Sequence, residues 1–137
     1  MRRARVLLAE DSPVVARQLG ALLEAEFDLV DIVNDGAAIF AAVAAFHPDV
    51  LVTDISLPGM DGMQAAESAL AAHRELRVVF ITVHAEGDLV ARARAMGRAA
   101  YVLKADAGDD LVEAVRSVVA GHWFVSGSLA RATVRGQ

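Results

Sequence analysis

The amino-acid sequence predicts a doubly wound α/β domain, with a parallel five-stranded sheet covered by helices on both faces. The main observation is that short, fully apolar runs alternate with longer helical segments along the chain, and such runs are typical of strands buried on both faces. A length of 137 residues is enough for one domain with its own core. A hydrophobic fraction of 55% with a net charge of −5 indicates a globular chain rather than a disordered one.

Composition also excludes several classes of protein and site. No apolar run approaches the roughly 18 residues of a membrane span, and the Arg-rich start lacks the longer apolar region of a secretory signal. The absence of cysteine excludes disulfides and thiolate metal sites. The acidic balance argues against direct binding of nucleic acid by this segment. We therefore expect a cytoplasmic protein without a membrane partner.

The first half of the chain predicts two strands and two helices. Ser12 is a good N-cap and Pro13 suits the first helical turn, so the first helix is expected to begin there. Polar and apolar side chains alternate in residues 28–33, which predicts a strand near an edge of the sheet. Pro48 ends the second helix because the residue before a proline avoids helical geometry. The expected elements are strand 5–9, helix 13–26, strand 28–33 and helix 37–46.

The second half predicts three more strands and three more helices. The apolar run 50–52 is a buried strand that leads to Asp54, and the Pro58-Gly59 pair behind it forms a tight turn. Gly97 and Gly121 are placed to end helices. The expected elements are strand 50–52, helix 62–73, strand 77–82, helix 85–96, strand 99–104 and helix 108–120.

The order of the strands decides which strand ends meet. We expect the order 2-1-3-4-5, which rests on the precedent of other doubly wound proteins. Ligands bind such sheets at the carboxyl ends of the strands where the order reverses, here between the first and third strands. Glu10 and Asp11 follow the first strand and Asp54 follows the third, so these acids converge. Thr82 is then expected beside Asp54, with Lys104 beyond it.

The chemistry of this edge favours a metal ion and a phosphoryl group. The site would hold three carboxylates, those of Glu10, Asp11 and Asp54. Carboxylates within about 4–6 Å of one another disfavour each other's ionised form. A hard cation such as Mg²⁺ offsets this, held by one or two carboxylates, a carbonyl and waters. The hydroxyl of Thr82 and the ammonium of Lys104, the single lysine among 13 basic residues, complete a site suited to phosphoryl transfer onto an aspartate.

These residues, at the ends of the expected strands, closely resemble bacterial response-regulator receiver domains of two-component signalling. The resemblance covers residues 4–120 and is carried by Glu10-Asp11, by Asp54 with Leu57-Pro58-Gly59-Met60-Asp61-Gly62 behind it, by Thr82, and by Tyr101-Val102-Leu103-Lys104. It implies a flavodoxin-like receiver fold and a phosphorylation-controlled switch. It implies no enzyme, beyond phosphoryl self-transfer and slow autodephosphorylation.

The resemblance also implies which residues accept the phosphoryl group and bind the metal. Asp54 would accept the phosphoryl group from the phosphohistidine of a sensor histidine kinase. Asp11, Asp54 and the backbone carbonyl of Ser56 would bind Mg²⁺ directly, and Glu10 would bind it through water.

The same resemblance implies a conformational switch. Thr82 would move to a phosphoryl oxygen, Lys104 would pair with the phosphoryl group, and Tyr101 would change its rotamer. Two departures from the family pattern bear on this site. Val83 stands where the family usually has a small residue, which, with His84 beside it, leaves the lifetime of the phosphoryl group open. The residues after Lys104 are Ala-Asp rather than Lys-Pro.

Residues 121–137 are expected to be a C-terminal tail or the start of a linker. Residues 121–126 resemble the segment that follows the receiver in NarL/LuxR-type regulators, before an output domain that is absent from this sequence. We favour a receiver fragment whose output domain binds DNA and controls transcription, with a possible homodimer on phosphorylation. The alternative is a stand-alone receiver that acts by protein–protein interaction or phosphorelay. Trp123 is expected at the end of the sheet opposite Asp54, with the tail apart from the phosphoryl site.

Three other functions fit the sequence less well. A Mg²⁺-dependent phosphohydrolase with Asp54 as nucleophile needs a general acid two residues later, where Ser56 stands. A flavodoxin-like FMN carrier needs a phosphate loop after the first strand, where Glu10 and Asp11 would repel the phosphate. A receiver-like protein that is never phosphorylated usually lacks an acid or the lysine, and none is missing here.

Overall fold

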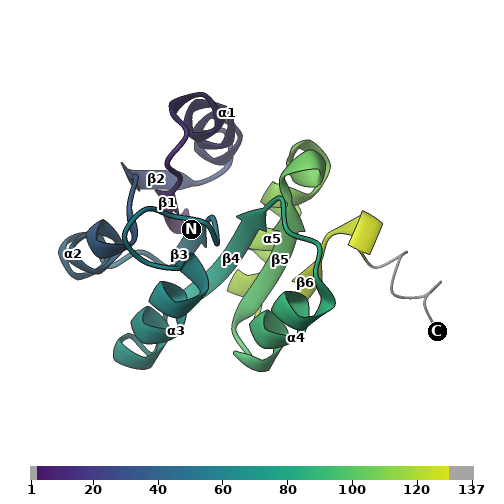
Figure 1. The fold of residues 1–137 in the computed structure, drawn as a ribbon. Coiled ribbons are helices and arrows are strands. Elements are labelled where there is room, and N and C mark those ends of the chain that lie inside the picture. The colour runs from purple at the N-terminus through teal and green to yellow at the C-terminus, as the bar shows by residue number, and fades with distance from the viewer. Residues whose placement is uncertain (1–2, 130–137) are drawn as a thin grey trace.

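The chain folds as a doubly wound α/β domain, as predicted, in a computed structural model that describes residues 3–129 (Figure 1). Within that range six parallel strands form one sheet in the order β2-β1-β3-β4-β5-β6. The strands are β1 (Arg5–Ala9), β2 (Asp28–Val33), β3 (Val50–Thr53), β4 (Arg77–Thr82), β5 (Ala99–Leu103) and β6 (Phe124–Val125). The helices are α1 (Pro13–Glu24), α2 (Gly36–Phe46), α3 (Gly62–Ala72), α4 (Gly87–Ala95) and α5 (Ala107–Val119), with a 3₁₀ turn η1 (Lys104–Asp106) between β5 and α5.

Two hydrophobic cores lie on opposite faces of the sheet. Consecutive side chains of a strand point to opposite faces, so Leu7 of β1 packs into the core that holds residues of α2, α3 and α4. Val6 and Leu8 pack into the core that holds residues of α1 and α5. Figure 1 shows the same division, with α1 and α5 on one side of the sheet and α2, α3 and α4 on the other. Because both faces are covered, the central strands β1, β3 and β4 are apolar except at their end residues.

The helix ends follow the predicted local signals closely. The side chain of Ser12 caps α1 by accepting a hydrogen bond from the amide of Val15 at 3.3 Å, and Pro13 is the first helical residue. Asp61 caps α3 in the same way, accepting from the amide of Met63 at 2.7 Å. Helix α1 ends two residues earlier than predicted and α4 begins two residues later. No helix within residues 3–129 combines the length and the apolar character that crossing a membrane requires.

The structure departs from the predicted five strands after α5. Gly121, with a φ of 88°, ends the helix and reverses the chain. The chain then adds β6 beside β5, with its first residue paired to Ala100 near the amino end of β5. Trp123 therefore lies at the end of the sheet opposite Asp54, as expected. Since β6 runs parallel to β5, however, the chain returns toward the carboxyl edge at Ser126, which the sequence analysis did not anticipate.

Candidate functional site

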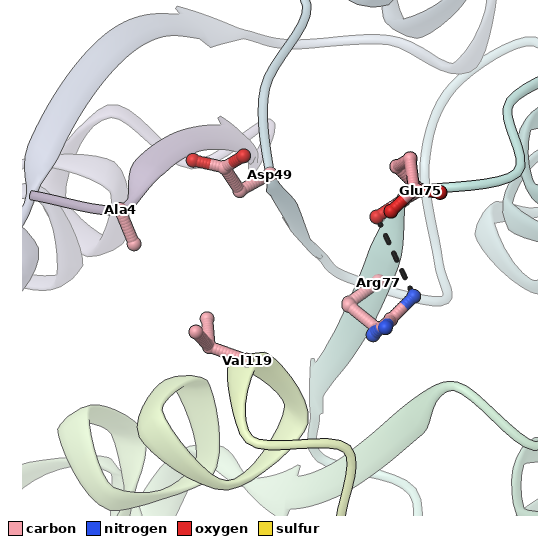
Figure 2. Close-up of a pocket in the computed structure, with 5 residues that line it drawn as sticks. All are labelled: Ala4, Asp49, Glu75, Arg77 and Val119. Atoms are coloured by element: carbon pink, nitrogen blue, oxygen red, sulfur yellow. Dashed lines mark hydrogen bonds between the residues drawn. The ribbon is translucent and has the colours of Figure 1, made fainter. Parts of the chain in front are cut away.

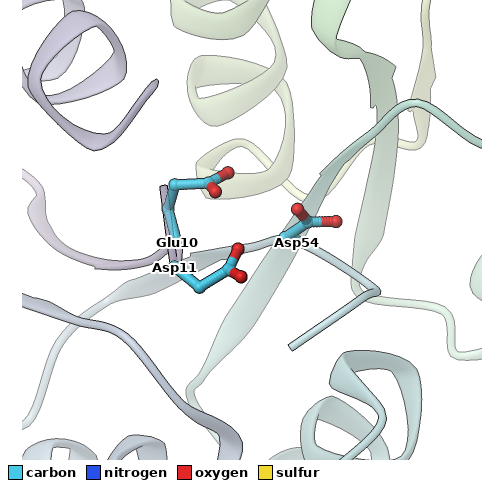
Figure 3. A group of neighbouring side chains, drawn as sticks. All are labelled: Glu10, Asp11 and Asp54. Carbon is cyan, nitrogen blue, oxygen red and sulfur yellow. The ribbon is translucent and has the colours of Figure 1, made fainter. Parts of the chain in front are cut away.

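Three carboxylates meet at the carboxyl edge of the sheet (Figure 3). Ala9 of β1 lies opposite Thr53 of β3, and Glu10 and Asp54 are the next residues along each strand. The backbone amide of Asp54 donates a hydrogen bond to the carbonyl oxygen of Ala9 at 3.1 Å, which holds the two strand ends together. One carboxylate oxygen from each of Glu10, Asp11 and Asp54 lies within 4.8 Å of the others. The predicted acid cluster is therefore present.

Lys104 offsets part of this negative charge. Its Nζ lies 2.7 Å from Oδ2 of Asp54 and 2.9 Å from Oε1 of Glu10. Both acids are buried, with 5% of Asp54 and 2% of Glu10 exposed, so water screens these ion pairs poorly. Burial lowers the pKa of Lys104, but the contacts with Asp54 and Glu10 outweigh burial and raise that pKa overall. Lys104 is therefore a cation at neutral pH.

Backbone amides orient the other carboxylate oxygens. The amide of Ser56 donates to Oδ1 of Asp54 at 3.1 Å, and the amide of Ser12 donates to Oε2 of Glu10 at 2.9 Å. Oε1 of Glu10 is buried and is held by its ion pair with the ammonium of Lys104. The three carboxylates, of which that of Asp11 is exposed to solvent, offer the oxygen ligands of a site for a hydrated divalent cation.

Gly62 allows the loop after β3 to fold tightly against the site. Its amide donates to the carbonyl oxygen of Ile55 at 2.7 Å. A Cβ atom at Gly62 would lie 2.0 Å from the backbone oxygen of Asp54, which no side chain tolerates. The glycine of the predicted turn motif is thus required by the close approach of α3 to the backbone of the acid.

His84 links the loop after β4 to the surroundings of Asp54. Its amide donates to Oγ1 of Thr82 at 3.2 Å, and its carbonyl oxygen accepts from the hydroxyl of Tyr101 at 2.8 Å. Its Nε2 lies 2.9 Å from Oγ of Ser56, two residues after Asp54. The imidazole therefore joins the loop after β4 to the loop after β3.

Tyr101 is fully buried, with its ring centroid 6.3 Å from that of Phe80. Burial raises the pKa of Tyr101 to about 12, and the negative charges of Glu86 and Asp88 add to that rise. The hydroxyl consequently stays protonated and serves as a hydrogen-bond donor.

The structure brings together most of the residues predicted for the site. Glu10, Asp11, Asp54 and Lys104 form one cluster. Lys104 follows β5, the strand beyond that of Thr82, as expected, and its side chain reaches two of the acids directly. Thr82 lies at the same edge, at the end of β4, where its hydroxyl bonds the backbone of the following loop.

His84 is the neighbour that the sequence analysis did not assign. Its contact with Ser56 joins residues 28 positions apart in the chain. In the sequence, only the position of His84 two residues after Thr82, at the end of a strand, could have indicated that it lies near the site. Val83, the departure from the family pattern, is 71% exposed, so its side chain faces solvent.

A small pocket at the opposite edge of the sheet has no part in this cluster. It has a volume of about 260 Å³ and is lined by Ala4, Asp49, Glu75, Arg77 and Val119 (Figure 2). Two of these residues, Asp49 and Arg77, stand at the amino ends of β3 and β4. The pocket therefore opens at the end of the sheet away from Asp54.

Comparison with known proteins decides the family of this chain. The sequence model of the response regulator receiver domain matches residues 6–116. The chain belongs to this family. Receiver domains are regulatory modules rather than true enzymes, in agreement with the expectation from the sequence.

Relatives with the same kind of domain place this receiver near transcriptional regulators. It is 34% identical over 116 residues to the transcriptional regulatory protein PdtaR of Mycobacterium tuberculosis, covering 84% of this chain and 56% of that protein. It is 33% identical over 131 residues to the probable transcriptional regulatory protein NarL of the same species, covering 93% and 60%. The chain thus spans little more than half the length of these curated relatives.

Solved structures agree with both the family and the fold. A LuxR-family two-component response regulator from Aurantimonas sp. SI85-9A1 superposes with a TM-score of 0.88 at 26% identity, covering 98% of this chain and 99% of that one. The signal receiver domain of the putative response regulator NarL from Mycobacterium tuberculosis superposes with a TM-score of 0.80 at 28% identity, covering 89% and 100%. This receiver is therefore of the NarL/LuxR type.

Proposed function

We propose that Asp54 is the phosphoryl acceptor of this receiver. The observation that carries the proposal is the ion pair of buried Asp54 with Lys104, 2.7 Å apart, inside a cluster of three carboxylates. Three acids and one amine at the carboxyl edge of a doubly wound sheet form a site for a cation and an anionic group together. Neither the phosphohydrolase nor the FMN carrier accounts for all four residues.

The residues present fit Mg²⁺, which prefers oxygen ligands and keeps several waters. Asp11, Asp54 and the backbone carbonyl of Ser56 would hold the ion directly, and Glu10, whose carboxylate lies in the same cluster, would bind it through water. When bound, the ion supplies positive charge beside the acceptor aspartate.

Transfer itself needs little covalent chemistry from the protein. A carboxylate oxygen of Asp54 forms a bond to phosphorus while the bond from phosphorus to the donor's imidazole nitrogen breaks, and the imidazole leaves with the electron pair. The ammonium of Lys104 lies 2.7 Å from Oδ2 of Asp54, close enough to form an ion pair with the phosphoryl group after transfer. The amide of Ser56 and the ammonium of Lys104 hold the two oxygens of Asp54 and so fix the plane of the carboxylate. Slow autodephosphorylation would return the site to its starting state.

Thr82 and Tyr101 are proposed to switch with phosphorylation. In the structure the hydroxyl of Thr82 bonds the amide of His84, and the hydroxyl of Tyr101 bonds the carbonyl of His84. If Thr82 turned to a phosphoryl oxygen, its bond to His84 would be lost, and the loop that also holds Tyr101 would be free to rearrange.

The wider role follows the family. We propose that residues 4–120 form the receiver unit, that residues 121–137 begin a linker, and that a sensor histidine kinase in the cytoplasm is the donor. The names of PdtaR and NarL support transcription control, exerted through an output domain outside this sequence. DNA binding would belong to that domain, and a homodimer on phosphorylation is part of the proposal.

The test is the intact mass of the chain after incubation with Mg²⁺ and acetyl phosphate. We expect one added phosphoryl group, which should not form when EDTA chelates the metal during the incubation and should be absent from Asp54→Asn. Asp109→Asn, which changes an exposed acid at the start of α5, is the matched control and should be phosphorylated normally. An adduct that survives Asp54→Asn would refute the assignment of the acceptor.

A further inference from the structure

The segment that follows β6 is bonded to the turn that carries Lys104. Ser126 is fully buried, and its amide donates to the carbonyl oxygen of Tyr101 at 2.8 Å. Its hydroxyl donates to the carboxylate of Asp106 and lies 3.3 Å from Oδ2 of Asp110. Asp106 is the last residue of η1, two residues after Lys104. A side chain far along the chain thus holds the turn next to the acid cluster.

Two neighbours of Ser126 strengthen this contact. The amide of Gly127 donates to Oδ2 of Asp110 at 3.1 Å, and the hydroxyl of Ser128 donates to Oδ2 of Asp106 at 2.5 Å. Hydrogen bonds to ionised carboxylates are stronger than those between neutral groups. Residues 126–128 therefore hold the turn η1 and the start of α5 together at the edge of the sheet.

We propose that Ser126 is a positioning residue for Lys104, and through it for phosphoryl transfer to Asp54; this inference rests on the proposed function. The turn η1 is closed by the amide of Ala107, which donates to the carbonyl of Lys104. Hydrogen bonds in a 3₁₀ turn have poor geometry, so η1 needs support from outside. Ser126 gives that support by holding Asp106, and the ammonium of Lys104 is thereby kept 2.7 Å from Asp54.

The coupling works in both directions. When two sites are linked energetically, each changes the other by the same free energy. A change in the partners of Lys104 at the acid cluster therefore changes how firmly residues 126–128 are held. The sixth strand brings Ser126 to this edge of the sheet. Hydrogen bonds then connect residues 126–128 with the turn that carries Lys104.

The first test does not depend on phosphorylation. Ser126→Ala in the full chain removes the hydroxyl and leaves the backbone, and we expect amide hydrogen exchange at Ala107, measured by NMR, to accelerate about tenfold. Ser117→Ala is the matched control. Ser117 lies near the far end of α5, where its hydroxyl bonds the carbonyl of Glu113, so its loss should not change exchange at Ala107. Unchanged exchange in a folded Ser126→Ala chain would overturn the inference. If that variant does not fold, Ser128→Ala takes its place with the same expectation.

The second test separates positioning from a purely structural role. The rate of phosphorylation by acetyl phosphate is measured for Ser126→Ala with Lys104 present and again in a Lys104→Met chain. We expect a loss of about tenfold in the first case and no further loss in the second, because the two changes act through one group. Equal losses in both backgrounds would overturn the inference. If the unaltered chain accepts no phosphoryl group, the proposed function fails, and the exchange at Ala107 decides this inference alone.

Discussion

Replacement of Lys104 by methionine tests the electrostatics of the site most directly. Methionine keeps much of the side-chain volume and removes the charge, so buried Glu10 and Asp54 lose the cation that lies 2.9 and 2.7 Å from them. Carboxylate oxygens of the two acids lie within 4.8 Å of each other, and two unit charges at that limit repel by about 3.5 kcal/mol at an effective dielectric constant near 20. Breaking a buried ion pair costs about 3–5 kcal/mol in general. We therefore expect the metal-free variant to lose about 3 kcal/mol of stability at neutral pH.

The assay is urea denaturation with and without Mg²⁺. Metal at 100 times its dissociation constant adds about 2.7 kcal/mol to the native state, and it should bind Lys104→Met more tightly than the unaltered chain. Arg92→Met is the matched control, because its ion pair with Glu67 is exposed and such pairs contribute at most about 1 kcal/mol.

Two outcomes would contradict this reasoning. If Lys104→Met lost no more stability than Arg92→Met, the ion pairs of Lys104 would be no stronger than a surface pair. If Mg²⁺ stabilised the unaltered chain and Lys104→Met equally, the lysine and the metal would not share the same carboxylates.

Three other predictions follow from the structure. Gly62→Ala should cost about 2 kcal/mol or more in urea denaturation, because its Cβ would lie 2.0 Å from a backbone oxygen; Gly108→Ala, with open space around it, should cost nothing measurable. Tyr101, the single tyrosine, has its folded pKa raised to about 12, so its contribution to stability is complete below pH of about 10 and is lost as pH rises toward 12. Tyr101→Phe should reduce this loss of stability at high pH. An absorbance titration of the unaltered chain with a midpoint near the ordinary tyrosine pKa would contradict the raised pKa of Tyr101. In a Mg²⁺ titration, Asp11→Ala should lose far more affinity than Glu10→Ala, and equal losses would contradict direct binding by Asp11.

The acid cluster could be predicted from the sequence because strands buried on both faces admit no charge until they leave the sheet. Glu10 follows the apolar residues of β1 directly, and Asp54 follows β3 in the same register. The first acid after each run therefore marks the edge of the sheet. The order of the strands then places the end of β1 beside the end of β3. That order was predicted from the precedent of other doubly wound proteins and not from these residues.

The contacts of His84 and Ser126 and the turn that follows β5 could not be predicted, since each depends on how a loop packs against the folded sheet. Nothing local in the sequence pairs His84 with Ser56, or turns the residues after β5 into a 3₁₀ turn. The two residues of β6 are too few to show any periodicity. They form a strand because the reversal at Gly121 leaves them alongside the open edge of β5.

The charges of the site explain why one lysine and one metal ion belong together. Three carboxylates and Lys104 give a formal charge of about −2 at neutral pH. A bound divalent cation would bring this to about zero. Transfer replaces the single charge of Asp54 by a phosphoryl dianion, so the phosphorylated site would carry about −1 with both cations present. Without the lysine it would carry about −2, and without the metal about −3. The buried acids Glu10 and Asp54 make such excess charge costly, so the amine and the ion act as two parts of one counter-charge.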